Sequence, residues 1–262
     1  MTALRHKLSS IRKRWQQAGV TLVELSVVLV IFGLLSWASF SAYETVAGQR
    51  ERDRAIAAAS EVQSNIRSFA LRNGRLPCPD TSSDGNGLET LAGGVCDGAT
   101  QLGWFPYLSL GMTLPDADLR ARYAVFRAGT VDPLTDADLA ISKERTSDQA
   151  GDLRNRDVSD LIVALNNAGR LSLDATHPYL TGDAGRAGAI DCTANRVTAV
   201  AYWIVLPLSD RDGDMGLLDA PHTKTNLCAT SLATAISVNF DDVVIAESPA
   251  QLAGWLRQTL PW

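Results

Sequence analysis

Residues 19–43 read GVTLVELSVVLVIFGLLSWASFSAY, and this stretch decides how the rest of the chain is organised. From Leu25 to Tyr43 it contains no charged side chain. At ~1.5 Å per residue, a helix of this length nearly spans the ~30 Å hydrocarbon core of a bilayer. Inside a bilayer, backbone N–H and C=O groups have no water to hydrogen-bond with, and a helix pairs them with one another. A helix is therefore favoured there although the segment contains several valines, which are weak helix formers in water. The sequence therefore predicts one membrane-spanning helix.

The residues before this helix set its orientation. They include five basic side chains and no acidic one: Arg5, Lys7, Arg12, Lys13 and Arg14. By the positive-inside rule, such a basic flank stays on the cytoplasmic side. The sequence thus predicts a single-pass protein in contact with membrane lipid, with a cytoplasmic N-terminus and everything after Tyr43 outside.

Glu24 is an acid just inside the apolar segment. An ionised carboxylate there is costly and calls for a compensating partner. A conventional secretory signal would be cut after the apolar stretch, at a small-residue site that Ser36 and Ala38 offer only loosely. The presence of Glu24 therefore argues against a conventional secretory signal.

The six residues Gly19 to Glu24, after a short basic leader, resemble the prepilin processing motif of type IV pilins and type II secretion pseudopilins. The resemblance implies that a prepilin peptidase cuts between Gly19 and Val20, that Val20 is N-methylated, and that the apolar helix is retained. Glu24 would then pair with the N-terminal amine of a neighbouring subunit. Val20 departs from the family, which most often has Phe at this position.

The resemblance also implies partners and a location. The partners would be other pilin or pseudopilin subunits and an inner-membrane assembly platform. The chain would lie in the bacterial inner membrane, with a periplasmic head, or in a periplasmic or extracellular filament.

Beyond the membrane, apolar residues recur every three or four positions from Ile56 to Ala70, as in an amphipathic helix. Asn73-Gly74 is a typical helix C-terminus, and Pro77 prevents the helix from resuming. The expected organisation is a leader at 1–19, a helix at 20–73 and a globular head at 74–262. Within the helix, about 20–43 would span the membrane and 44–73 would form a stalk.

Four apolar or β-branched runs in the head are expected to be antiparallel strands. They are residues 121–128, 159–166, 197–207 and 236–246. Ser248-Pro249 is a good start for a last helix. The predicted fold class is α+β, pilin-like, with the long N-terminal helix packed on an antiparallel sheet.

The four cysteines, Cys78, Cys96, Cys192 and Cys228, form no CxxC and have no histidine nearby, which disfavours a zinc site. Disulfides fit an exported head better. Of the three possible connectivities, Cys78 with Cys96 and Cys192 with Cys228 is favoured, because shorter loops close more easily.

Asp210, Asp212 and Asp214 alternate like the start of a calcium loop, but Met215 and Pro221 stand where an EF-hand needs Gly and Glu. Asp219 or backbone carbonyls would have to complete an irregular site; calcium is used by some pseudopilin heads. The simpler alternative is a solvated acidic turn. No other cofactor is expected.

Composition and motifs limit the function classes. Without the five leader cations, 19 Lys and Arg face 29 Asp and Glu, a poor match for nucleic acid. No HExxH, GxSxG, P-loop or GxGxxG motif is present, so an enzyme is not expected. The alternative to a filament subunit is a single-pass anchored module whose head binds a ligand or protein, and its leader would stay uncut.

Overall fold

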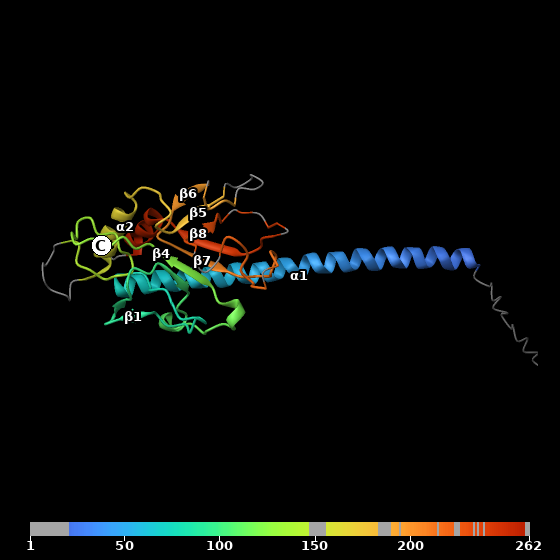
Figure 1. The fold of residues 1–262 in the computed structure, drawn as a ribbon. Helices are drawn as coiled ribbons and strands as arrows, with labels where there is room; N and C mark the ends of the chain where they lie inside the picture. The colour runs from blue at the N-terminus through green and yellow to red at the C-terminus, as the bar shows by residue number, and fades with distance from the viewer. Residues whose placement is uncertain are drawn as a thin grey trace, which may run out of the picture. The chain divides into compact units, whose positions relative to one another are not determined.

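The computed structural model describes residues 21–146, 156–182, 190–193, 195–213, 215–222, 226–232, 234, 236–237 and 239–259 (Figure 1). The chain divides into two compact units, residues 1–49 and 50–262. Helix α1 (Leu22–Asn73) begins in the first unit and ends in the second. The fold class is α+β, as the sequence predicts.

The last part of α1 belongs to the core of the second unit. Its buried side chains follow helical spacing: Ala59, Val62, Ile66, Phe69 and Ala70. The helix ends where the Asn73-Gly74 pair predicts, because Gly74 adopts a left-handed φ of 59° and its N–H donates to the Ala70 carbonyl at 3.0 Å. A residue with a Cβ would be strained at this φ and would meet the Asp157 backbone at 2.7 Å.

A four-stranded antiparallel sheet lies at the centre of the head, in the order β3-β4-β7-β9. Its strands are β3 (Leu102–Trp104), β4 (Arg122–Val125), β7 (Tyr202–Leu206) and β9 (Val243–Glu247). Alternate residues of β7 enter different clusters, since strand side chains point to opposite faces. Tyr202, Ile204 and Leu206 join the core that contains α1, whereas Trp203 and Val205 join a smaller cluster.

That smaller cluster lies against a second sheet of order β6-β5-β8. Its strands are β5 (Tyr179–Thr181), β6 (Arg196–Ala199) and β8 (Cys228–Thr230). β5 pairs with β6 antiparallel but with β8 parallel, so the head is mainly, not wholly, antiparallel. β1 (Leu91–Ala92) and β2 (Val95–Cys96) form a small antiparallel pair, and short 3-10 turns span Leu108–Leu110 and Ala117–Leu119.

The expectation of a strand at 159–166 is wrong, because this run lies within helix α2 (Val158–Ala168). A capping box starts the helix: the Asp157 side chain accepts the Ser159 N–H at 2.7 Å, and Asp160 accepts the Asp157 N–H at 3.1 Å. Helix α2 packs against α3 (Pro249–Thr259), the last helix that the sequence predicts.

The other three expected strands have different bounds. Of the run 121–128, only Arg122–Val125 forms a strand, β4. The run 197–207 is divided between β6 and β7, which belong to different sheets. At the division, the Val200 N–H donates to Pro178 and the Ala201 N–H donates to Glu247. The run 236–246 gives an isolated bridge between Ser237 and Phe240, and its strand begins only at Val243.

Two disulfides close loops in the head. Cys78 is joined to Cys96 and Cys192 to Cys228, with Cα–Cα distances of 5.5 and 5.9 Å. This is the pairing favoured by the loop-length argument. The first bridge fastens the turn-rich segment after α1, and the second ties β8 to the segment before β6.

Candidate functional site: the N-terminal segment and the head surface

The N-terminal segment that the sequence singles out is described from Thr21 onward, so Gly19 and Val20 lie outside the described residues. Glu24 lies in the first turn of α1. Its Oε2 accepts the backbone N–H of Thr21 at 2.8 Å and the Thr21 hydroxyl at 3.0 Å. In return the Glu24 N–H donates to Thr21 Oγ1 at 3.2 Å.

This reciprocal pair is a capping box, which satisfies backbone donors that the first helical turn leaves unpaired. The carboxylate is therefore held against Thr21, at the N-terminal end of α1. This capping role was not predicted from the sequence, although the pattern Thr-x-x-Glu before an apolar run is its usual signature.

The helix that follows is apolar and unburied. Leu22–Phe40, 19 residues with a mean hydropathy of 2.1, is the one helical segment among the described residues that is long and apolar enough to cross a membrane. None of it is buried. An apolar surface of this length requires lipid or protein neighbours, since leaving it in water is unfavourable.

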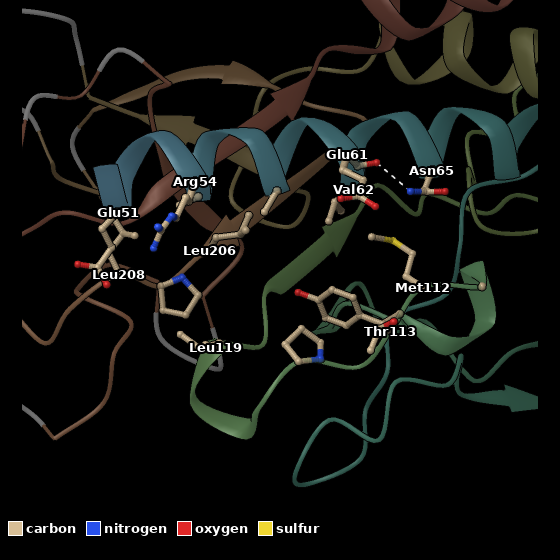
Figure 2. A pocket seen from close by; sticks show the side chains of 16 residues that line it. Glu51, Arg54, Glu61, Val62, Asn65, Met112, Thr113, Leu119, Leu206 and Leu208 are labelled. Carbon is tan, nitrogen blue, oxygen red and sulfur yellow. Dashed lines mark hydrogen bonds between the residues drawn. The ribbon is translucent and has the colours of Figure 1, made fainter. Parts of the chain in front are cut away.

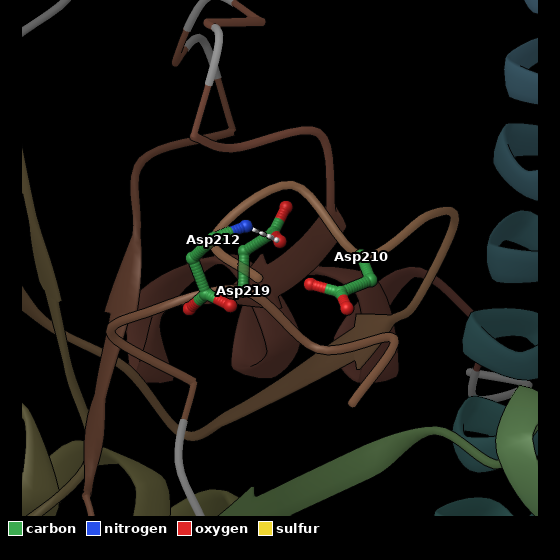
Figure 3. Close-up of side chains that lie close together, drawn as sticks. All are labelled: Asp210, Asp212 and Asp219. Carbon is green, nitrogen blue, oxygen red and sulfur yellow. Dashed lines mark hydrogen bonds between the residues drawn. The ribbon is translucent and has the colours of Figure 1, made fainter. Parts of the chain in front are cut away.

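Of the predicted calcium ligands, Asp210 and Asp212 lie in the loop after β7, and Asp214 lies outside the described residues. Carboxylate oxygens of Asp210, Asp212 and Asp219 all lie within 4.8 Å of one another (Figure 3). Asp210 and Asp212 are exposed, whereas Asp219 is fully buried and accepts the Asp212 N–H at 3.2 Å.

Two further aspartates approach this loop from just before β9. Asp241 and Asp242 are both buried, and their carboxylates lie within 4.8 Å of that of Asp219. Neither aspartate was predicted as a ligand, because nothing in the local sequence relates Asp241 and Asp242 to Asp219 in an earlier loop.

A groove of about 680 Å³ lies on the head beside α1 (Figure 2). Val62 of the helix and Met112 and Leu208 from the opposing loops provide apolar surface, while Glu51 and Arg54 provide charge. This groove was not predicted from the sequence, because its walls come from three separated parts of the chain.

Comparison with known proteins identifies the N-terminal segment. Residues 16–40 match the family described as the prokaryotic N-terminal methylation motif. No curated protein and no solved structure matches the chain. The match includes Gly19, Val20 and Glu24, together with most of the apolar helix. The chain thus carries the N-terminal methylation motif that is the hallmark of prepilin-type pilins and pseudopilins, and this motif supports a prepilin-processed, pilin-like protein.

Proposed function

We propose that the chain is a minor subunit that assembles into a type IV pilus or a type II secretion pseudopilus, and that it acts by assembly rather than by catalysis. A prepilin peptidase removes residues 1–19, and Val20 becomes the methylated N-terminus. The observation that carries the proposal is the match of residues 16–40 to the N-terminal methylation motif.

The apolar helix has two successive surroundings in this proposal. Before assembly Leu22–Phe40 is anchored in the inner membrane, with the N-terminus cytoplasmic and the head periplasmic. In the filament, the same exposed surface packs against the corresponding helices of neighbouring subunits. The unburied state of this segment in the single chain supports a role for it between molecules.

Glu24 has two candidate partners in this scheme. In the single chain its carboxylate accepts hydrogen bonds from Thr21. During assembly the amine of Val20 on a neighbouring subunit would be a stronger donor, because both groups are charged. The neighbouring amine would then replace Thr21, and each charge would be compensated in a low-dielectric core.

The first experiment is intact-mass measurement of the protein extracted from membranes. We expect a chain that begins at Val20 and carries the mass of one added CH₂ group. The alternative, a single-pass anchored binding module whose head groove takes a ligand, requires an intact leader. A chain that begins at Met1, or one cut beyond Tyr43, would therefore contradict the proposal.

The second experiment separates assembly from helix capping. Glu24→Ala removes both roles, whereas Thr21→Ala removes the hydroxyl partner but leaves the carboxylate. We expect Glu24→Ala to be inserted and cleaved yet largely absent from sheared filaments, and Thr21→Ala to be incorporated nearly as well as the wild type. Membrane levels of each variant serve as the control. If both variants are depleted equally, Glu24 acts as a cap and not as an assembly residue.

A further inference from the structure

The three buried aspartates Asp219, Asp241 and Asp242, here termed the aspartate trio, form a site that the proposed function does not use. Their exposed fractions are 0, 4 and 3 %. Each contributes a carboxylate oxygen that lies within 4.8 Å of those of the other two. Carboxylates are rarely buried together without a compensating charge, because burial and mutual repulsion both penalise the ionised forms.

The compensation visible among the described residues is incomplete. Arg211 is the cation that pairs with the trio, through Nε to Asp241 Oδ2 at 2.8 Å. His222 Nδ1 lies 2.6 Å from Asp242 Oδ2, but its Nε2 accepts the Thr230 N–H at 3.1 Å. The imidazole proton is therefore on Nδ1, and the ring is a neutral donor. With all three carboxylates ionised, the one guanidinium leaves two negative charges uncompensated.

One oxygen of the trio has no hydrogen-bond partner within the described part of the chain. This atom is Asp242 Oδ1, which is buried. Asp242 Oδ2, in contrast, accepts from His222 and from the Asp219 N–H at 3.1 Å. A buried polar atom left without a partner carries a desolvation penalty, so it points to a ligand that the described residues do not supply.

The other two carboxylates also keep acceptor capacity. Within the described residues, Asp219 Oδ2 accepts one hydrogen bond, from the Asp241 N–H at 2.8 Å, and Asp241 Oδ1 accepts one, from the Ser209 N–H at 3.2 Å. Asp219 Oδ1, on the side of the exposed loop, already accepts the N–H groups of Arg211 and Asp212. The free capacity of Asp219 therefore favours the trio over the Asp210–Asp212 side.

We propose that the aspartate trio binds one calcium ion, with one carboxylate oxygen from each of Asp219, Asp241 and Asp242 as ligands. Calcium–oxygen distances of about 2.3–2.6 Å place ligands on opposite sides of the ion up to about 5 Å apart, and the trio's carboxylate oxygens lie within 4.8 Å of one another. The ion's charge would cancel the two negative charges that three ionised carboxylates and Arg211 leave. Its all-oxygen ligands favour calcium over zinc, which prefers nitrogen and sulfur. Such an ion would fasten the loop after β7 to the start of β9, independently of filament assembly.

The test is calcium-dependent thermal unfolding of the full-length chain in detergent, after treatment with a chelator. Calcium at about a hundred times its Kd should raise the unfolding midpoint by about 5 °C or more. Magnesium should have a smaller effect, because it requires shorter distances and gives up water reluctantly. Calorimetric titration should give one calcium per chain.

Single Asp→Asn substitutions test which carboxylates bind the ion. Asp242→Asn should lose the calcium response, whereas Asp118→Asn, a charge control at an exposed position, should keep it. Asp210→Asn should also keep it. Asp241→Asn replaces Asp242→Asn if the latter does not fold. A wild-type chain that neither binds calcium nor gains stability from it would overturn the proposal. Loss in Asp210→Asn with retention in Asp242→Asn would also overturn it, by placing the ion in the exposed loop.

Discussion

Ile66 and Ile56 both lie on α1, but the first side chain is buried and the second is partly exposed to solvent. Ile66 is fully buried in the core of the head, whereas Ile56 is 45 % exposed. Replacing each by alanine makes the same chemical change at the two positions. The comparison therefore measures how far the end of α1 is part of the head's core.

The expected losses in the free energy of unfolding differ widely between the two variants. Alanine at position 66 removes three buried carbon groups, worth about 0.8 kcal/mol each, and leaves a cavity that brings the loss to about 2–5 kcal/mol. In a domain of this size, each kcal/mol lowers the unfolding midpoint by about 2–4 °C, so a fall of about 4–20 °C is expected. At position 56 the change should stay within about 0.5 kcal/mol, because little surface is lost and alanine is the better helix former.

The assay is thermal unfolding of both full-length variants in detergent, followed by tryptophan fluorescence, which reports on the buried Trp203 of β7. Circular dichroism at low temperature checks that each variant is helical. Equal shifts in the two variants, or no shift for Ile66→Ala, would refute the reasoning that this part of α1 supports the head through its buried face.

Two further predictions concern polar contacts in the head. Asp157→Ala removes the N-cap of α2 and should lower the free energy of unfolding by about 1 kcal/mol, measured by urea denaturation; an unchanged value would contradict the capping role. Burial acts to raise the pKa of Asp136, but hydrogen bonds from Arg145 and Lys143 outweigh it and lower the pKa. The stabilisation from this acid is therefore present above its unfolded-state pKa, near pH 4, and is lost as the pH falls through the lower folded-state pKa. Asp136→Asn should be less stable at pH 7 and should lose less stability on acidification than the wild type, and a parallel loss in the two proteins would argue against the ion pair as the cause.

Several features were predictable because their causes are local. The end of α1 follows from Asn73 and Gly74, since only a residue that tolerates positive φ ends a helix in this way. The apolar stretch after Glu24 predicts a helix from its length and lack of charge. The methylation motif is contiguous, and its residues need no partner from elsewhere in the chain to be recognised.

The error at 159–166 has a physical reason. A short apolar run fits both a buried strand and a helix, because eight residues are too few to separate a period of 2 from one of 3.6. The N-cap at Asp157 and the capping-box carboxylate of Asp160 stabilise the first turn and so favour the helix. Asp160 also accepts the Arg145 N–H at 2.6 Å, a contact that no local pattern predicts.

The sequence by itself determined the N-terminal segment: its apolar helix, its acid at Glu24 and its processing motif are all encoded in neighbouring residues. Only the tertiary structure decided that 197–207 divides between two sheets, that a groove forms beside α1, and that Asp219 meets Asp241 and Asp242. Local rules act through hydrogen bonds and side-chain spacing within a few residues, whereas these features arise when distant segments bury their apolar faces against one another. The aspartate trio therefore exists only because the folding of β7 and β9 into one sheet brings its members together.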